Sequence, residues 1–367
     1  MTRVCFVIDT LSRAGTETQL LALIRNLDRS RVEPSLVLLD GSDVLSQSLE
    51  PADCPTLRLG VTKLASLQAM RAARQLHRFW EQHRPDVVQA YFMDSAYFAI
   101  PVAKFCGIRK IVRVRNNLGY WLTRKHRVLN RVMRRFVSVT LTNSEQGREQ
   151  LVRERVGSVH VIENGVDTFH LNTLRSEDSA SRLTVMCVAN LRPVKNIDGL
   201  LRAAANIVQQ RPEVHFEIAG DGPERGHLES LRDSLGLQQH VTFRGSVSDI
   251  PAFLTTGSVA VLPSHSEGMS NALLEMMAAG LGVVATDVGA NARVLADTGV
   301  IVPPGNDVAL VAGILSLLDQ PERAVQLGVS ARQRVEAHFS RHAMCRQFED
   351  FYLSLVAGVR QHALVAD

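Results

Sequence analysis

Two glutamates eight residues apart form the pattern in this sequence that most suggests chemistry. Glu267 and Glu275 lie in the segment 264–280, which follows an apolar run at Val259–Leu262 and passes through small residues into helical periodicity. Ser270 is a suitable cap for that helix. Glu267 is therefore expected in the loop before the helix. Glu275 is expected one to two turns inside it. Its apolar neighbours favour a buried carboxylate over a solvated one, and a buried carboxylate needs partners such as sugar hydroxyls.

The start of the same helix is expected to bind an anion. Backbone N–H groups at a helix N-terminus point outward, and the helix dipole favours a phosphate there. The residues expected at this donor-binding position are Gly268, Met269, Ser270 and Asn271.

Two cations and a glycine turn follow earlier apolar runs. Arg192 and Lys195 come after Thr184–Ala189, and a planar guanidinium beside a point charge suits a diphosphate. Gly220 ends a later run within Gly-Asp-Gly-Pro, a turn that lets a ligand or another loop approach closely. Taken alone, each segment is better explained as surface charge or as a structural turn.

The loop after the first apolar run holds a single glycine, Gly15, just before a helical stretch. It lacks the glycine spacing of a dinucleotide-binding fingerprint. Two interpretations remain open. The loop is either an anion-binding helix start or a plain strand-to-helix turn with Thr16 as the cap.

Parallel strands joined by helices are needed to position these residues, and the sequence has that rhythm. Short β-branched runs alternate with helical stretches, and ligands bind at the carboxyl ends of parallel strands, so the loops after strands are the expected sites. The expected strands are Val4–Ile8, Ser35–Leu39, Asp86–Gln89, Lys110–Val114, Ser138–Thr142, His160–Glu163, Thr184–Ala189, His215–Ala219, Val241–Arg244, Val259–Leu262, Val283–Thr286 and Val300–Val302. The expected helices of the first half are Glu17–Leu27, Leu64–Gln82, Ser95–Phe105, Trp121–Phe136 and Glu145–Val152.

Length and a polar interruption predict two domains. The chain has 367 residues, and the polar stretch Leu171–Ser181 near its midpoint is typical of a linker. We expect a doubly wound domain over residues 1–170 and a second over 171–342. A C-terminal helix at about 343–367 is expected to pack back onto the first domain.

Composition excludes several classes of protein. With 46% hydrophobic and 21% charged residues the chain is typical of a globular protein, which excludes disorder, collagen and a disulfide scaffold. No run approaches the ~20 apolar residues of a membrane span, and the first apolar run is too short for a signal peptide. The five cysteines are scattered, with no histidine at metal-ligand spacing. We therefore expect thiols in a reducing cytoplasm and no metal site.

The net charge of +4 hides an asymmetry, because residues 1–170 carry +9 and the remainder −5. The segment Lys104–Arg135 holds 11 basic residues and no acidic one. Within it, Trp121–Phe136 has apolar and basic residues at helical spacing, which suits either an anionic membrane surface or a core-packing helix with a solvated basic face. Nucleic acid is a weaker partner candidate, because aromatic stacking residues are scarce, and we predict no nucleic-acid partner.

Taken together, the motifs resemble a known family. The pattern Ser-x-x-Glu-Gly-x-x-Asn-x-Leu-Leu-Glu-x-Met-Ala-x-Gly from Ser264 is similar to the E-x7-E signature of the retaining glycosyltransferases of family 4, which have the GT-B fold. The segments Glu163–Asp167, Arg192 with Lys195, Gly220–Pro223 and Phe339-Ser340 agree with that family in type and order.

The resemblance implies an α/β architecture of two Rossmann-like doubly wound domains facing across a cleft, and it implies roles for the residues. Arg192 and Lys195 would hold the diphosphate of a nucleotide-sugar, Glu275 its ribose and Glu267 the transferred sugar. Departure of a nucleoside diphosphate builds negative charge, which two cations and a helix N-terminus stabilise. Such enzymes use no metal for chemistry and no separate cofactor.

Departures from the family pattern leave the sugar and the acceptor open. Where the family often has a histidine after Lys110–Val114, this chain has Asn116 preceded by Arg115. We take these two residues and Asp94 as acceptor-side candidates. The family's first glycine pair is Ala14-Gly15 here, and a frequent acid is replaced by Arg293.

We therefore predict a metal-independent, retaining hexosyltransferase that uses a nucleotide-sugar, with UDP favoured over GDP. The predicted acceptor is a glycan or lipid-linked glycan of cell-surface polysaccharide or lipopolysaccharide synthesis. The predicted location is the cytoplasm, with peripheral attachment to the inner face of the plasma membrane as an option. A nucleotide-sugar 2-epimerase and a catalytically silent GT-B binding protein are the alternatives.

Overall fold

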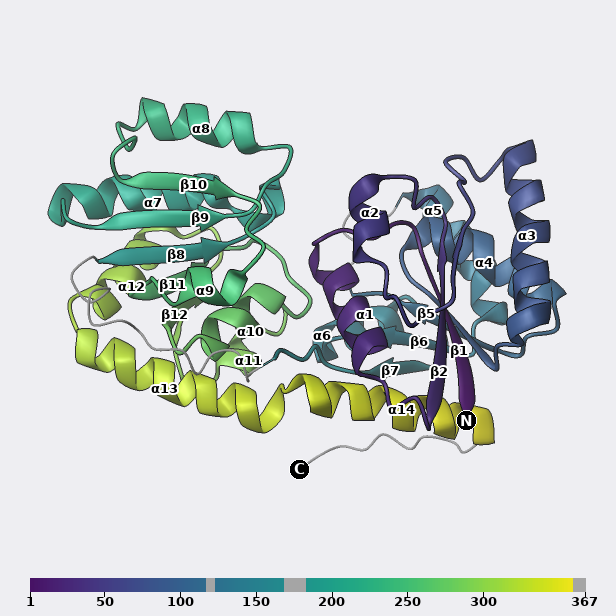
Figure 1. Ribbon diagram of the computed structural model, residues 1–367. Helices are drawn as coiled ribbons and strands as arrows, with labels where there is room; N and C mark the ends of the chain where they lie inside the picture. The colour runs from purple at the N-terminus through teal and green to yellow at the C-terminus, as the bar shows by residue number, and fades with distance from the viewer. Residues whose placement is uncertain (117–122, 168–182, 359–367) are drawn as a thin grey trace. The chain divides into compact units, whose positions relative to one another are not determined.

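The computed structural model describes residues 1–116, 123–167 and 183–358 (Figure 1). The chain forms two compact units. Unit 1 comprises Met1–Asn164 and the segment from Arg341 onward, and unit 2 comprises Gly165–Ser340. The chain thus passes between units at residue 164, whereas the sequence placed the boundary at residue 170. The expected linker at 171–181 lies outside the described residues.

Unit 1 is built on a seven-stranded parallel sheet with strand order β3-β2-β1-β4-β5-β6-β7. The strands form where β-branched and apolar residues are consecutive, as expected for strands covered on both faces. They are β1 (Thr2–Ile8), β2 (Val32–Leu38), β3 (Thr56–Arg58), β4 (Val87–Ala90), β5 (Lys110–Val114), β6 (Val139–Thr142) and β7 (Val159–Val161).

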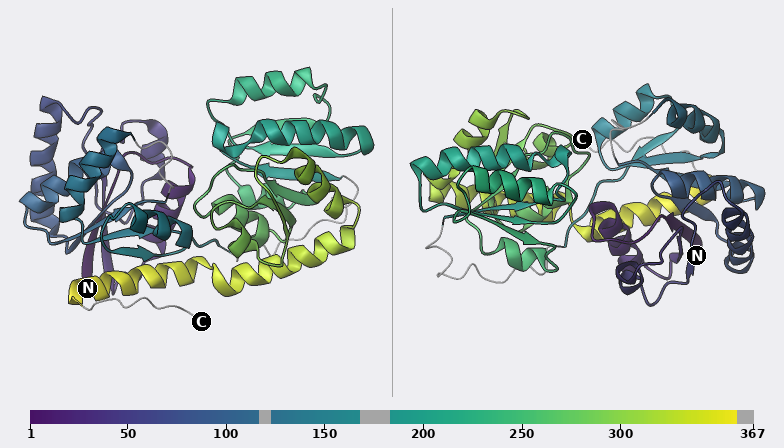
Figure 2. Two further views of the ribbon diagram at one scale, coloured as in Figure 1. Left: turned by 180° about the vertical axis from the view of Figure 1, so that it is seen from behind. Right: turned by 90° about the horizontal axis from the view of Figure 1, so that it is seen from above.

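Helices cover both faces of this sheet (Figure 2). One face packs against α1 and α14 through residues such as Leu20 and Tyr352, and the other packs against α3 and α4 through residues such as Leu76 and Ile100. The helices are α1 (Gly15–Asn26), α2 (Val44–Leu49), α3 (Leu67–His83), α4 (Met93–Phe105), α5 (Arg124–Met133), the 3-10 turn η1 (Arg134–Phe136), α6 (Glu145–Arg153) and α14 (Arg341–Ala357).

Unit 2 repeats this plan with a six-stranded parallel sheet of order β10-β9-β8-β11-β12-β13. One face packs against α7, α8 and α12, the other against α9, α10, α11 and α13. The strands are β8 (Thr184–Val188), β9 (His215–Ala219), β10 (Val241–Gly245), β11 (Val259–Leu262), β12 (Gly282–Thr286) and β13 (Val300–Val302). The helices are η4 (Pro193–Lys195), α7 (Ile197–Gln210), α8 (Arg225–Ser234), α9 (Ile250–Leu254), α10 (Asn271–Ala278), α11 (Asn291–Leu295), α12 (Asp307–Leu318) and α13 (Pro321–His338).

The strand order of each sheet reverses at one point. In unit 1 the reversal lies between β1 and β4, and in unit 2 between β8 and β11. Loops diverge at such a point and leave room for a ligand beyond the carboxyl ends of the two strands. The loops predicted to carry the chemistry in unit 2, which hold Lys195 and Glu267, are the two that follow β8 and β11.

The twelve expected strands are confirmed; four have the expected limits, and the ends of the others are shifted by up to a few residues. Three helix predictions need correction. Ala14, not Thr16, is the N-cap residue of α1. The helix expected at Trp121–Phe136 begins at Arg124, and residues 117–122 lie outside the described ones. The C-terminal helix begins at Arg341 rather than 343, and its expected residues beyond 358 are not described.

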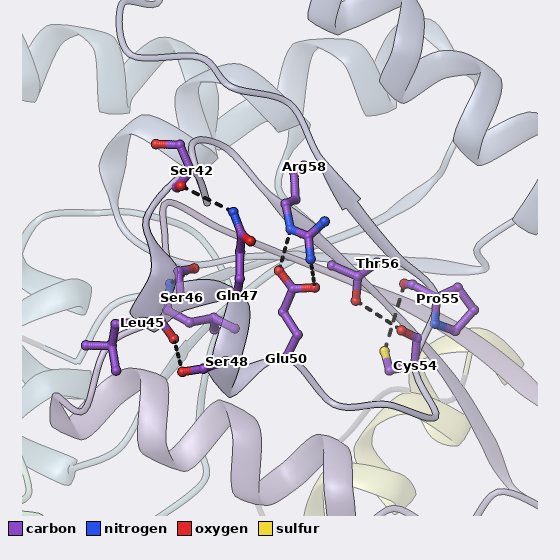
Figure 3. Close-up of polar contacts among 11 residues, drawn as sticks. Ser42, Leu45, Ser46, Gln47, Ser48, Glu50, Cys54, Pro55, Thr56 and Arg58 are labelled. Carbon is purple, nitrogen blue, oxygen red and sulfur yellow. Dashed lines mark hydrogen bonds and ion pairs between the residues drawn. The ribbon is translucent and has the colours of Figure 1, made fainter.

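The segment between β2 and α3 contains two elements absent from the sequence prediction, α2 and β3. Both are short and rich in polar residues, so periodicity gives little signal. Asp43 caps α2 by accepting the Ser46 N–H at 2.7 Å. Figure 3 shows Arg58 of β3 held by both carboxylate oxygens of Glu50 at 2.6 and 2.5 Å.

A buried hydrogen-bond network fastens α14 to the unit 1 sheet. The Tyr352 hydroxyl donates to Gln89 Oε1 at 3.0 Å, and Gln89 Nε2 donates to the Tyr91 hydroxyl at 2.7 Å. Burial raises the pKa of Tyr352 well above its ordinary value, so this hydroxyl stays protonated in the folded unit.

Tyr352→Phe is expected to lower the free energy of unfolding of the protein by about 1–3 kcal/mol, because it leaves Gln89 Oε1 buried without a donor. Urea titration followed by Trp fluorescence measures this change. An unfolding midpoint equal to that of the wild type would show that the network adds nothing to stability.

Within the described part of the chain, no helix is both long and apolar enough to span a bilayer.

Candidate functional site

The loops that follow β8 and β11 are joined by hydrogen bonds. The His265 N–H donates to the Val194 carbonyl at 2.8 Å, and Asn196 Nδ2 donates to the Pro263 carbonyl at 3.1 Å. Asn196 is buried and has a left-handed backbone (φ 53°), a conformation that asparagine tolerates better than most residues. The η4 turn and the loop before α10 therefore form one surface.

Lys195 and Glu267 form an ion pair on that surface. Lys195 Nζ lies 2.6 Å from Glu267 Oε1, and the two side chains are 22% and 10% exposed. The Ser264 hydroxyl donates to the same oxygen at 2.7 Å. Glu267 Oε2 makes no hydrogen bond with a described residue, so it can accept hydroxyl donors from a ligand.

Three residues behind Glu267 hold its loop in place. The Thr286 hydroxyl donates to the Ser264 carbonyl at 2.7 Å, and Asn291 Nδ2 donates to the Thr286 carbonyl at 3.0 Å. Gly289 has φ 58°, and a Cβ there would lie 2.4 Å from the Glu267 carbonyl oxygen. Sequence reasoning missed Ser264, Thr286 and Asn291 as positioning residues. Their small polar side chains after predicted strands were the available signal.

Arg192 precedes Lys195 by three residues, and Gly220 lies against the loop that carries both cations. Arg192 is exposed, and its side chain makes no hydrogen bond or ion pair with a described residue. Gly220 (φ 130°) lies against the loop that carries Arg192, because a Cβ at Gly220 would be 1.9 Å from the Ala189 carbonyl oxygen. The Leu191 N–H also donates to the Asp221 carbonyl at 3.0 Å. The glycine turn therefore fixes the loop after β8.

The residues predicted at the start of α10 are buried or half-buried. The Ser270 hydroxyl is occupied as the N-cap by the Leu273 N–H, and the Met269 side chain is buried in the core. Gly268 and Asn271 are half-buried. Glu275 is half-buried in the second turn of the helix, between residues that pack into the core.

The unit 1 residues that were predicted as sites differ in exposure. Gly15 is exposed at the first position of α1, and Asp94 is exposed in the first turn of α4. Arg115 is 8% exposed, and its Nη1 lies 2.6 Å from Glu154 Oε2. Asn116 lines a cavity of about 30 Å³, where Thr142 Oγ1 and Asn143 Oδ1 have no hydrogen-bond partner among the described residues.

Asp9 follows β1 at the reversal point of unit 1. Its Oδ1 accepts the Ser95 N–H at 2.9 Å and the Ser95 hydroxyl, so it caps α4 from another strand. Burial raises the pKa of this carboxyl, with Asp94 adding to the effect. No local pattern around Asp9 indicates that it is the partner of Ser95.

No group of three or more histidine, cysteine, aspartate or glutamate side chains gathers as metal ligands would in the described part of the chain.

Two family models match this chain. Residues 13–169 match the family model described as "Glycosyltransferase Family 4", and residues 175–334 match "Glycosyl transferases group 1". The two matches follow one another and correspond to the two units. The chain belongs to glycosyltransferase family 4.

Known proteins are similar to this glycosyltransferase over most or part of its length. It is 25% identical to the lipopolysaccharide core biosynthesis glycosyltransferase LpsD of Rhizobium meliloti over 346 residues, which are 93% of this chain and 95% of LpsD. It is 32% identical to the alpha-D-kanosaminyltransferase of Streptomyces kanamyceticus over 175 residues, which are 47% of this chain and 45% of that protein.

The fold prediction is confirmed by solved structures. HepE of Anabaena, crystallised with UDP and glucose, matches with a TM-score of 0.83 at 20% identity, over 96% of this chain and all of HepE. The glycosyltransferase thus has the GT-B fold of two Rossmann-like domains.

Proposed function

We propose that this glycosyltransferase moves a hexose-type sugar, with retention of anomeric configuration, from a nucleotide-sugar to a glycan or lipid-linked glycan. The proposed donor is a UDP-sugar, with a GDP-sugar as the second choice, and the proposed pathway class is cell-surface polysaccharide or lipopolysaccharide synthesis. The observation that carries the proposal is the Lys195–Glu267 pair at the reversal point of unit 2. The name of LpsD and the UDP complexes of HepE support the acceptor and donor classes.

The leaving group is a nucleoside diphosphate, whose negative charge grows as the glycosidic bond breaks. The Lys195 side chain is 22% exposed and Arg192 is exposed, so both can reach a diphosphate. The N-terminus of α10 adds outward N–H groups. Because these groups are in place before the reaction, they stabilise developing charge without reorganisation.

Glu267 suits the transferred sugar better than the diphosphate. A carboxylate repels phosphate oxygens, but its Oε2 accepts hydrogen bonds from sugar hydroxyls. Because Lys195 is paired with Oε1, less free energy is needed to hold the ammonium and the carboxylate close to the donor. The ion pair thus marks the junction between the sugar and its leaving group.

No metal, cofactor or strong protein base is part of the proposed mechanism. The acceptor oxygen forms the new bond on the face that the leaving group departs from. The acceptor proton passes to the departing phosphate oxygen, and the two cations carry the charge.

The acceptor is proposed to bind unit 1, near Asp94 and Asn116. Arg115 is a positioning residue in this proposal, because its guanidinium is already paired with Glu154. The small cavity beside Asn116 offers further hydrogen-bonding groups.

A thermal-shift screen with UDP-, GDP- and ADP-sugars tests the donor assignment, because a ligand raises apparent stability by RT ln(1 + [L]/Kd). Release of nucleoside diphosphate only when acceptor is present supports transfer. Conversion of the nucleotide-sugar without acceptor would favour the epimerase alternative, and binding without turnover would favour a silent scaffold.

Glu275→Ala is expected to lower donor turnover more than tenfold, because the variant loses the carboxylate proposed to bind the ribose hydroxyls. Steady-state release of nucleoside diphosphate measures the effect. Glu336→Ala is the matched control, since Glu336 is an exposed helical glutamate on α13 that pairs with Arg332. Equal rates for both variants would remove Glu275 from the site.

We also propose that α5 docks on an anionic membrane. No side chain of α5 is buried, and Val128, Leu129 and Val132 are 65%, 36% and 41% exposed. This apolar face is surrounded by arginines, which matches the charge and the interior of an anionic bilayer. Docking would place the enzyme at the cytoplasmic face of the membrane that carries its acceptor.

Replacing Arg131, Arg134 and Arg135 by glutamine is expected to lower binding to phosphatidylglycerol vesicles at least tenfold, at about 1 kcal/mol per cation. Donor binding should not change. Vesicle sedimentation measures the effect, and the same three-charge change at Arg202, Arg211 and Arg244 of unit 2 is the control. Equal sedimentation of the two triple variants would contradict membrane docking through α5.

A further inference from the structure

The arginine of β5, Arg113, is buried without an acid to balance it. Arg113 is 5% exposed, and no carboxylate of a described residue lies within ion-pair distance of it. The segment from Lys104 to Arg135, which includes residues 117–122, contains no aspartate or glutamate. A buried cation normally needs a paired anion, because burial removes its hydration.

The contacts of Arg113 are neutral. Its Nη1 donates to Asn130 Oδ1 at 2.8 Å, and its guanidinium carbon lies 5.7 Å from the ring centre of Tyr97. The Tyr97 hydroxyl donates to the same Asn130 oxygen at 3.0 Å. Burial, followed by repulsion from Arg115, lowers the pKa of Arg113 to about 10. The neighbouring acid Glu154 is already paired with Arg115.

One edge of the Arg113 guanidinium is unused. Nε is buried and has no hydrogen-bond partner, and Nη2 makes no hydrogen bond with a described residue. These two nitrogens form the edge that binds a phosphate or carboxylate with two parallel hydrogen bonds. These two nitrogens are therefore the donors of the buried side chain that an anion would use.

The surroundings favour an anion of more than one charge. Asn130 lies on α5, and one turn to either side of it are Arg127 and Arg134. Arg134 donates to the Arg155 carbonyl, and Arg127 is exposed. The helix α5, which carries Asn130 beside Arg113, buries no side chain.

We propose that Arg113 is the base of a phosphate-binding site in unit 1, covered by α5 and distinct from the donor site. The ligand group is a phosphate monoester or pyrophosphate, bound by Nε and Nη2 of Arg113 with Arg127 near it. The inference rests on the proposed function only for the biological source of this group, which is a lipid-linked acceptor or a lipid headgroup.

The test is a calorimetric titration of the full-length protein with inorganic phosphate at constant ionic strength. Because the donor site also suits phosphate, the titration is made in the Lys195→Ala background. Arg113→Met is expected to weaken phosphate binding at least tenfold. In phosphate-free buffer it should melt no lower than its parent, because an uncompensated charge has been replaced by an apolar side chain.

Two further variants keep the test decisive. Arg113→Lys retains the charge but loses the fork, so it should also bind phosphate more weakly if the site is real. Arg202→Met removes an exposed cation from unit 2 and should leave phosphate binding unchanged. Equal phosphate affinity of the parent and Arg113→Lys, or no phosphate binding by the parent, would overturn the proposal.

Vesicles distinguish the two sources of phosphate. If phosphatidic acid vesicles bind the parent more tightly than Arg113→Met, and soluble phosphate competes, the source is a lipid headgroup. If the binding of soluble phosphate depends on Arg113 but the binding of vesicles does not, the proposal holds with the acceptor as the source. Neither measurement depends on turnover. A wrong donor assignment would therefore not be mistaken for the absence of a phosphate site at Arg113.

Discussion

Lys195→Ala is expected to lower nucleoside diphosphate release about a hundredfold with saturating donor, the scale of removing one preorganised donor from a developing anion. The variant removes a charge that lies 2.6 Å from Glu267 at the proposed leaving-group position. It also leaves a carboxylate that is 10% exposed without its cation, which repels the incoming diphosphate. Steady-state kinetics and UDP titration together measure both effects.

A second variant separates charge stabilisation from repulsion. Lys195→Ala combined with Glu267→Gln removes the repelling carboxylate, so UDP affinity should recover while turnover stays low. Lys104→Ala is the control, since Lys104 is an exposed lysine of unit 1. Turnover of Lys195→Ala within a factor of two of the wild type would contradict the assignment of Lys195 to the leaving group.

Gly220→Ala is expected to abolish most donor binding and to lower the free energy of unfolding of unit 2 by at least about 2 kcal/mol. Its φ of 130° is strained for any residue with a side chain, and the added Cβ would lie 1.9 Å from the Ala189 carbonyl oxygen. The obstructing atom is backbone, so the loop that carries Arg192 must move. Urea unfolding followed by circular dichroism measures stability, and UDP titration measures binding.

Gly226→Ala is the matched control in the same segment. A Cβ at Gly226 meets nothing within 4 Å, and the residue lies in the first turn of α8. Alanine there should stabilise unit 2 by roughly 0.4–1 kcal/mol, because it restricts the unfolded chain. If the two alanine variants had the same stability, the close approach at Gly220 would not limit the fold.

Local sequence predicted the elements of this protein well. The limits of β5, β9, β11 and β13 agree with the structure, because a run of β-branched residues bounded by turns needs no distant information. The elements it missed, α2 and β3, are short and depend on contacts such as Arg58 with Glu50, which join one to the other.

The surroundings of the basic helix could not be predicted from its sequence. Its periodicity fitted both a core-packing helix and a surface helix, since the two differ only in what lies against the apolar face. In the structure, Met133 and Phe136 pack partly against the core, whereas Val128, Leu129 and Val132 stay exposed. Only tertiary packing could assign them.

By itself the sequence determined the two Rossmann-like halves, the order of the motifs and the residue types near the site, because these depend on local periodicity and on chemistry. The tertiary structure alone decided which groups meet. Lys195 pairs with Glu267 across 72 residues because β8 and β11 are neighbours in the sheet, and Arg113 stays without an acid because Glu154 pairs with Arg115. Such pairings depend on strand order and on the return path of the chain, and no local pattern encodes them.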